Sequence, residues 1–270
     1  MNSESLQEAK YLTKEAIAKM APSVFSTKPS SEVSDKYTHI PTERVIDDME
    51  LLGWKPIEAK QVAARKSSTK GFQKHLLVFR NDDVVINGED GDTVYPQIML
   101  TNSHDGKNSF QFQAGLYRMI CSNGLVIADE QFESVKMRHM GYSFEDLQDM
   151  IKEMVGKLPL TVESMNKMKA IEMAEEQILA FAKDALNARF TKKEMNRIEV
   201  DLKELTTPTR KEDKGSDLWS VFNVVQEKLI EGDFQYRAGG KVRQARVIKN
   251  FKQDMKINKK LFNVALEYAA

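Results

Sequence analysis

The sequence predicts an α+β fold: an antiparallel β-sheet core with flanking helices, followed by a helical C-terminal region. Two observations predict it. Residues 54–112 alternate between short apolar runs and turns rich in Gly, Asn, Asp or Ser, which is typical of antiparallel hairpins. After residue 142, apolar residues recur every three or four positions, as in amphipathic helices. We expect three parts: an N-terminal helix and loop at 1–40, the sheet core at 41–158, and a helical region at 159–270 packed on the core.

The N-terminal part predicts two helices joined by a loop. Apolar residues line one face of a helix at 4–20, and the Ser-, Thr- and Pro-rich stretch 22–38 predicts a loop. A second helix begins at residue 41. Thr42 is suited to cap its start, and Gly53 is suited to the left-handed conformation at its end.

The predicted sheet covers residues 54–140 as one antiparallel sheet. Strands are expected in "KPIEAKQVAARKS", "KHLLVFR" and "DVVINGEDGDTVYPQIMLTNS". The stretch "SFQFQAGLYRMI" is compatible with both element types, because Phe110 and Phe112 alternate as in a strand while Leu116 and Met119 suit a helix. We expect the Asn- and Gly-containing turns at 102–106 and 122–124 to lie near each other.

The C-terminal half predicts a series of helices. Ser143 and Asp146 form a capping box before the first, and Thr161 opens a long second helix that runs to Phe190. The next helix, "LWSVFNVVQEKLI", carries an apolar seam that we expect to be buried against the C-terminal helices: Trp219, Phe222, Val225 and Leu229. Two basic helices are predicted at 242–252 and 258–268.

Composition excludes several protein classes. The chain has 270 residues, of which 41% are hydrophobic and 30% charged, as in globular proteins. No apolar run approaches the ~20 residues of a membrane helix, so no membrane association is expected. The first twenty residues lack the apolar core of a secretory signal, and Cys121 is the only cysteine, which excludes an intrachain disulfide. These features predict a cytoplasmic protein, including the cytoplasm of an infected cell.

The formal net charge is zero, but the charges are unevenly distributed. Residues 141–236 hold 14 Lys and Arg against 19 Asp and Glu, whereas residues 237–270 hold nine against two. The C-terminal segment is therefore strongly basic beside an acidic neighbour. Either the two attract each other within the fold, or the basic segment binds anions.

The stretch 100–127, "LTNSHDGKNSFQFQAGLYRMICSNGLVI", concentrates polar residues between apolar ones. Turn formation by Asx and Gly residues explains part of it. The remaining side chains form a candidate site if both turns meet at one end of the sheet: Asn102, His104, Asp105, Arg118, Cys121 and Asn123.

Several chemistries are open at this candidate site. His104 with Asp105 has the composition of an oriented base, and Cys121 with His104 that of a nucleophile and base. Adjacent side chains on a strand point to opposite faces, however, so His104 and Asp105 cooperate only if the turn redirects one of them. Arg118 either binds phosphate or forms a structural ion pair, and Cys121 is equally consistent with a small buried residue. No complete catalytic, metal or phosphate-loop motif is present, so no cofactor and no metal are expected, and an enzyme is not favoured.

Four segments occur together in an order that resembles a known family: "RVIDDMELLGW", "KHLLVFR", "IMLTNSHDGKNSFQFQAGLYRMICSNGLVI" and "PTRKEDKGSDLWSVFNVVQEKLIEG". This pattern resembles the DUF932 family, the phage/plasmid-like proteins of bacteriophages, prophages and plasmids. The most specific segments are Asn-Ser-His-Asp-Gly at 102–106 and Gly-aromatic-Arg followed by Cys-x-Asn-Gly-Leu at 115–125. The resemblance covers residues 40–270. It implies a mobile-element protein and supplies no catalytic residues.

The basic segment is the best-defined binding signal in the sequence. Its candidate nucleic-acid-binding residues combine cations with an aromatic side chain: Tyr236, Arg237, Lys241, Arg243, Arg246, Lys249 and Lys252. Cations of this kind neutralise phosphates and nearby aromatic rings stack on unpaired bases. The alternative is a solvated surface whose charge offsets the acidic segment.

The function predicted first is non-enzymatic nucleic-acid binding, with single-stranded DNA favoured, in the recombination or replication of a mobile element. The second is a factor that binds a host or phage protein and alters host machinery or host defence. The third is an enzyme centred on the NSHDG motif. The sequence leaves homo-oligomer formation open.

Overall fold

A computed structural model describes residues 11–35, 37–64, 66–87, 93–118, 124–125, 135–137, 142–209 and 213–270. The fold is α+β, as predicted. The chain forms two compact units. The first comprises residues 1–85, 95–115 and 134–155, and the second comprises residues 86–94, 116–133 and 156–270.

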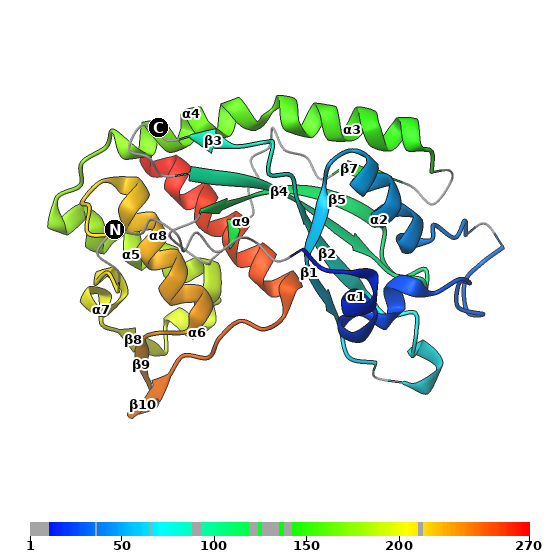
Figure 1. Cartoon of the computed structure of the whole chain (residues 1–270). Coiled ribbons are helices and arrows are strands. Elements are labelled where there is room, and N and C mark those ends of the chain that lie inside the picture. The colour runs from blue at the N-terminus through cyan, green and yellow to red at the C-terminus, as the bar shows by residue number, and fades with distance from the viewer. Residues whose placement is uncertain are drawn as a thin grey trace, which may run out of the picture. The chain divides into compact units, whose positions relative to one another are not determined.

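The larger sheet carries its strands in the order β1-β2-β4-β5-β6 (Figure 1). These strands are β1 (Lys55–Gln61), β2 (His75–Arg80), β4 (Thr93–Asn102), β5 (Phe110–Arg118) and β6 (Gly124–Leu125). Two short strands pair at its sides: β3 (Ile86–Asn87) with β4 and β7 (Val135–Met137) with β5. The predicted antiparallel sheet over 54–140 is confirmed for the described strands, and the ambiguous stretch at 109–120 is a strand over its described part.

The core of the first unit lies on β2, whose six residues are all buried. A strand covered on both faces reads as a continuous apolar run, which explains why "HLLVF" does not alternate. Two phenylalanines of β5, Phe110 and Phe112, are also fully buried, and their rings meet edge to face at 5.2 Å. The sheet therefore presents a rigid frame at the start of β2 and the end of β4, where the NSHDG motif begins.

The helices of the first unit are α1 (Lys14–Met20), the 3-10 turn η1 (Pro22–Phe25), α2 (Thr42–Leu51) and α3 (Phe144–Gly156). Residues 4–10 of the predicted first helix lie outside the described residues. Gly53 ends α2 with φ +82°, as expected. The predicted cap by Thr42 is wrong: Pro41 holds the cap position and Thr42 is the first helical residue. Its hydroxyl is instead committed to buried partners in the sheet.

The second unit is built around α8 (Leu218–Glu231), which is buried along most of its length. It contacts α4 (Leu158–Lys169), α5 (Glu175–Arg189), α7 (Leu202–Thr206) and α9 (Phe251–Tyr268). The short helix α6 (Lys192–Met195) follows α5. The predicted seam is confirmed: Trp219 is 3% exposed, and Phe222, Val225 and Leu229 are fully buried. The ring of Phe222 meets Phe262 of α9 at 6.1 Å.

The predicted long helix from Thr161 to Phe190 is wrong, because the helix is interrupted between the end of α4 and the start of α5. At the break, Leu218 N donates to Ile171 O at 2.9 Å and Met173 N donates to Ser216 O at 3.0 Å. These bonds to a distant segment replace the helical ones. The Gln177 side chain then accepts from Ala174 N at 2.8 Å and starts α5.

The predicted basic helix at 242–252 is also wrong. Residues 242–244 belong to β10 (Lys241–Gln244), which forms an antiparallel hairpin with β9 (Gln235–Ala238), and β8 (Ile198–Val200) pairs with the other side of β9. Residues 245–250 have no regular secondary structure. Gly239 and Gly240 connect the strands with φ +58° and +74°. Two consecutive positive φ values give a two-residue turn whose twist fits antiparallel strands, and glycine adopts them at low cost. The helix that follows, α9, begins at Phe251 and includes the predicted 258–268.

Candidate functional site

The β9–β10 hairpin sorts its side chains onto two faces. Antiparallel partners share a face, and the register pairs Arg243 with Tyr236 and Lys241 with Ala238. Tyr236, Lys241 and Arg243 therefore lie on one face. The pair formed by Val242 and Arg237 lies on the other.

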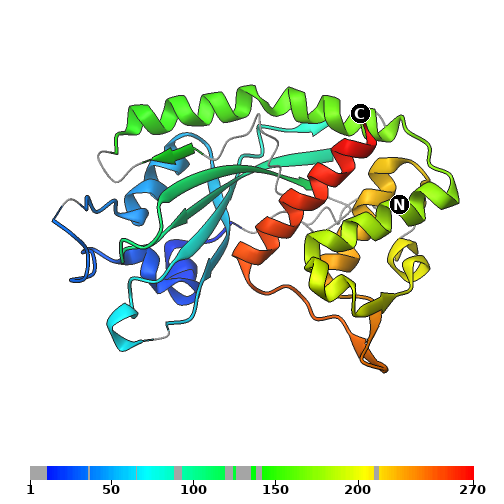
Figure 2. The ribbon, with the colours of Figure 1, turned by 180° about the vertical axis from the view of Figure 1, so that it is seen from behind.

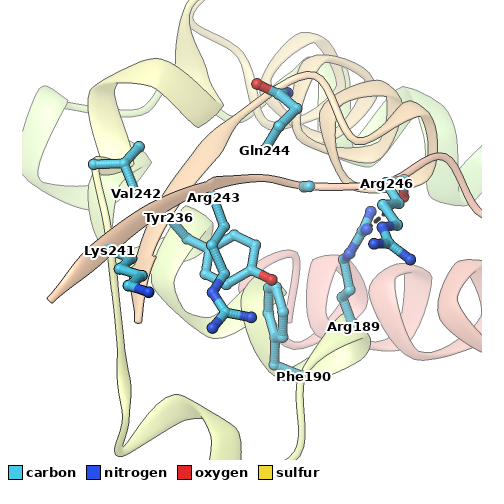
Figure 3. A pocket seen from close by; sticks show the side chains of 9 residues that line it. Arg189, Phe190, Tyr236, Lys241, Val242, Arg243, Gln244 and Arg246 are labelled. Atoms are coloured by element: carbon cyan, nitrogen blue, oxygen red, sulfur yellow. Dashed lines mark hydrogen bonds between the residues drawn. The ribbon is translucent and has the colours of Figure 1, made fainter. Parts of the chain in front are cut away.

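The first of these faces borders a hollow of about 710 Å³. Its lining consists of cations, aromatic rings and small or polar side chains of the hairpin and the end of α5: Arg189, Phe190, Tyr236, Lys241, Val242, Arg243, Gln244, Ala245 and Arg246. Figure 3 shows the guanidinium of Arg243 beside the ring of Tyr236, with Phe190 below and Arg189 close to Arg246. None of the described residues that line this hollow carries a carboxylate. We call it the basic hollow.

The aromatic rings in and next to the basic hollow contact one another through Phe190. Phe190 meets Tyr236 at 5.6 Å between centroids and Phe234 at 6.4 Å. Phe234 is fully buried, whereas Phe190 and Tyr236 are half-buried. Because the Phe190 and Tyr236 rings are inclined at 61°, they do not cover each other face to face. Aromatic surface is thus left beside the cations.

Arg189 contacts three different segments around the hollow. Its guanidinium donates to the Leu229 carbonyl and, at 2.5 Å, to the Arg246 carbonyl, and it lies 5.4 Å from the centre of the Phe234 ring. Burial lowers the pKa of this guanidinium, but an arginine remains charged at neutral pH. Arg189 therefore adds positive charge to the hollow and fastens the segment after β10 to α8.

Three cations around the hollow have no carboxylate partner among the described residues. Lys241, Arg243 and Arg246 are exposed, and no ion pair joins them to a carboxylate within the part of the chain that the structure describes. Acidic residues of the second unit pair elsewhere, as Asp233 does with Lys228 at 2.6 Å. The arrangement leaves cationic side chains available to an anion.

The structure brings together four of the seven predicted binding residues, Tyr236, Lys241, Arg243 and Arg246. Arg237 lies on the opposite face of the hairpin, where β9–β8 pairing sets it beside Glu199. Lys249 is exposed on the segment that leads to α9, and Lys252 belongs to α9 with a side chain outside the described part. Arg189 and Phe190 were not predicted, since they lie at the end of α5, far from the hairpin in the sequence, and no local pattern marks them.

The second predicted site, the NSHDG motif, forms a buried polar cluster in the first unit. Asn102, Ser103 and His104 are fully buried, as are Thr42 and His75. The β2–β4 register sets His75 directly opposite Asn102. The ring of His104 lies 4.6 Å from that of His39 and 5.2 Å from that of His75. Three of the four histidines thus converge, although they are far apart in the sequence.

A chain of hydrogen bonds determines which ring nitrogen of His75 carries the proton. His75 Nδ1 lies 3.1 Å from the Gln73 carbonyl, which only accepts, so Nδ1 carries the proton and donates to it. His75 Nε2 then accepts from the Thr42 hydroxyl at 2.9 Å, and this oxygen accepts from Asn102 Nδ2 at 3.0 Å. Burial lowers the pKa of His75 to about 4. His75 is therefore neutral at physiological pH.

His104 and Asp105 engage separate partners. Asp105 Oδ1 accepts from Ser103 Oγ at 2.7 Å and from Lys107 N at 3.0 Å, which shapes the turn. The His104 ring points into the buried cluster. Of the other predicted members, Arg118 ends β5 with a side chain outside the described residues, and Cys121 and Asn123 lie outside them entirely. The expected proximity of the two turns thus stays a prediction.

The cluster fastens the N-terminal loop onto the sheet. Ser30 N donates to His104 O at 2.8 Å, and the Tyr37 hydroxyl donates to Ser103 O at 3.1 Å. Gly106 adopts φ +69°, and a Cβ there would lie 3.1 Å from Val33 Cγ1. Within the described residues, the motif therefore links the N-terminal loop to the sheet through hydrogen bonds and close packing.

Among the described residues, no group of three or more His, Cys, Asp and Glu side chains is arranged to hold a metal ion. None of the helices in the described ranges combines the length and the apolar character needed to span a bilayer.

Comparison with known proteins identifies the family. The model of the family described as "Domain of unknown function (DUF932)" matches residues 29–262. The chain belongs to the DUF932 family. Similar relatives include the UPF0380 proteins YafZ and YfjQ of Escherichia coli (strain K12), each 31% identical over 255 residues, which are 94% of this chain and 90% of the relative. No solved structure matches the chain. The family resemblance read from the sequence is thereby confirmed, and the match includes both the NSHDG motif and the basic hollow.

Proposed function

We propose that this DUF932 protein binds single-stranded nucleic acid through the basic hollow of its β9–β10 hairpin. The observation that carries the proposal is the composition of that hollow: four cations and two half-buried aromatic rings, with no carboxylate in the lining. Cations neutralise the phosphates of a nucleic acid, and aromatic rings stack on its unpaired bases.

The spacing of the groups suits one strand of nucleic acid. Lys241 and Arg243 lie two residues apart on one face of β10, about 7 Å along an extended strand, which is close to the distance between successive phosphates. Tyr236 lies opposite Arg243, so a base stacked on its ring leaves its own phosphate near the guanidinium. Cations alone would bind any polyanion; the rings beside them favour bases that are free to stack.

An unpaired strand fits this hollow better than a duplex. Phe190 and Tyr236 are half-buried, and a base reaches such rings only when it leaves the stack of its neighbours. In a duplex the bases are paired and stacked, and only the phosphates are accessible to the cations. We therefore propose single-stranded DNA as the ligand, which fits a role in recombination or replication of a mobile element.

The test is fluorescence anisotropy with an unstructured single-stranded oligonucleotide across a salt series. Replacing Lys241, Arg243 and Arg246 together with Ala removes three phosphate contacts. This change should weaken binding to all sequences alike and flatten the slope of log affinity against log salt by about 2, since each contact on a single strand contributes roughly 0.7.

A matched control is available in the same unit. Lys256, Lys259 and Lys260 are three exposed lysines of α9, and replacing them with Ala removes the same charge away from the hollow. Their loss should change affinity by no more than about twofold. If both triple variants weaken binding equally, the interaction is diffuse attraction and the hollow is not the site. If the wild-type protein shows no binding at low salt, the proposal fails and a protein partner becomes the leading candidate.

A further inference from the structure

Three further cations lie on the segment that joins α5 to β8. This segment, residues 191–197, includes α6 and is called the α6 segment below. Its cations are Lys192, Lys193 and Arg197, and all three side chains are exposed. No ion pair joins any of them to a carboxylate among the residues that the structure describes. Like the cations of the hairpin, they are available to an anion.

The α6 segment contains a single carboxylate, and its oxygen is bound within the segment. Glu194 Oε2 accepts from Thr191 N and from Thr191 Oγ1, both at 2.7 Å. These hydrogen bonds lower the pKa of Glu194 below its ordinary value, so the group remains ionised. Three cations against one carboxylate leave the α6 segment with a formal charge of +2.

The α6 segment is connected to the basic hollow at both of its ends. It follows Phe190, whose ring lies 5.6 Å from the Tyr236 ring in the hollow. It then enters β8, where Ile198 pairs with Ala238 and Val200 pairs with Tyr236. Residues directly opposite each other share a face, so Ile198 and Val200 lie on the Tyr236 face of the sheet. β8 and the hairpin project together from the helices of this unit (Figure 2).

The register also limits the distance between the two groups of cations. Ile198, which follows Arg197, stands in one row across the sheet with Ala238 and Lys241. Adjacent strands lie about 4.8 Å apart, so the row spans about 10 Å from β8 to β10. This is about one to two phosphate spacings of an extended single strand. A strand that leaves the hollow therefore meets the α6 segment within a few nucleotides.

We infer that the α6 segment is a second contact region for the same nucleic-acid strand, so that a single strand held in the basic hollow continues over Lys192, Lys193 and Arg197. This inference rests on the proposed function and extends its binding site beyond the hollow. The hollow supplies aromatic rings for bases, whereas the α6 segment supplies cations without an aromatic side chain. Its contacts therefore go to phosphates and do not depend on the base sequence.

The experiment compares oligothymidines of about four and about twelve nucleotides, using the full chain and fluorescence anisotropy across a salt series. For the wild-type protein, the slope of log affinity against log salt should be steeper for the longer strand by about 2, because each of three further contacts contributes roughly 0.7. A longer strand also offers more binding registers, but these raise the affinity without changing the slope. The slope therefore reports the added phosphate contacts.

Replacing Lys192, Lys193 and Arg197 together with Ala should remove this difference between the strands. The slope for the longer strand should fall to the wild-type value for the shorter one, while the affinity for the shorter strand stays within about twofold of wild type. None of the three residues lines the hollow, and all are exposed, so the variant should fold as the wild-type protein does. Replacing the two lysines with Arg keeps their charge and should keep the steeper slope.

The triple alanine variant of Lys256, Lys259 and Lys260 on α9 is the matched control, since it removes the same charge from another part of this unit. Its slopes should match those of the wild-type protein for both strands. The second contact region is overturned if the wild-type protein gives the same slope for both strands, or if the α6-segment variant keeps the wild-type slope for the longer one; in both cases the proposed function stands. Absence of binding to either strand at low salt overturns both.

Discussion

The NSHDG cluster and the basic hollow use similar residues in opposite ways. In the cluster, Asn102, His104 and Thr42 are fully buried, and hydrogen bonds to one another and to the backbone of neighbouring segments fix their positions. In the hollow, Lys241 and Arg243 are exposed and carry charge that the described carboxylates do not pair. The first region holds the fold of its unit together, and the second is open to a ligand.

In the sequence, both regions are clusters of polar or charged residues, and only the structure shows that one is buried and the other exposed. Polar residues packed between apolar runs draw attention as a catalytic motif, and those of the motif that the structure describes are largely buried and hydrogen-bonded within the fold. Burial turns the same side chains into determinants of stability, because each lost partner leaves a polar group without compensation. The charges of the hairpin are exposed and contribute little to stability, and under the proposed function they contribute to binding instead. Substitutions in the two regions should therefore have separate effects.

The largest effect is expected for Asn102→Ala in the buried cluster. Asn102 donates to Thr42 Oγ1, lies 3.5 Å from Ile40 O and accepts from Ser103 N at 2.8 Å. Its loss leaves buried groups unpaired and should lower the free energy of unfolding by about 3–4 kcal/mol. Urea unfolding measures this change. Affinity for a single-stranded oligonucleotide, measured where the variant is folded, should stay within about twofold of wild type; a large loss would connect the cluster to the binding site.

Acidification should act on the same cluster. The folded pKa of His75, about 4, lies below its unfolded value of 6.5, so the unfolded chain takes up a proton first as the pH falls. The stability contributed by neutral His75 is complete above about pH 6.5 and is lost between pH 6.5 and 4, by roughly 3 kcal/mol. His75→Gln, which does not titrate, should show a correspondingly smaller loss across this window in urea unfolding series. Parallel curves for the two proteins would contradict the assignment.

An intermediate effect is expected for Tyr236 in the hollow. Tyr236→Ala should weaken single-strand binding by about 1–3 kcal/mol with an unchanged salt slope, because stacking releases no counterions. Tyr236→Phe keeps the ring and should retain most of the affinity. Anisotropy at several salt concentrations measures both quantities. A salt slope that falls in Tyr236→Ala would mean that the ring positions a cation instead of stacking on a base.

Elements that depend on the local spacing of apolar residues could be predicted from the sequence, whereas features that depend on contacts between distant residues could not. The sheet and the seam on α8 follow from periodicities of two and of three to four residues, which are local. The break between α4 and α5 depends on bonds from Ile171 and Met173 to residues 216 and 218, so no local pattern marks it. The histidine cluster likewise depends on the register that sets His75 opposite Asn102.

The hairpin at 235–244 was missed for a different reason. Arg243 and Arg246 are three residues apart, and Val242, Ala245 and Ile248 recur at the same spacing, as on two faces of a helix. That spacing favoured a basic helix. The deciding residues are Gly239 and Gly240, because two consecutive glycines permit the positive φ values of a tight turn. Four of the predicted residues line one hollow, but the division of the segment into two faces requires the strand register.

The smallest effect tests that division directly. Arg237 and Arg243 are both exposed arginines of the same hairpin, but the register places only Arg243 on the Tyr236 face. Arg243→Ala should lower the salt slope for a single strand by about 0.7, whereas Arg237→Ala should leave slope and affinity nearly unchanged. Equal losses for both variants on a single strand would show that the hairpin binds through charge alone, without a distinction between its faces.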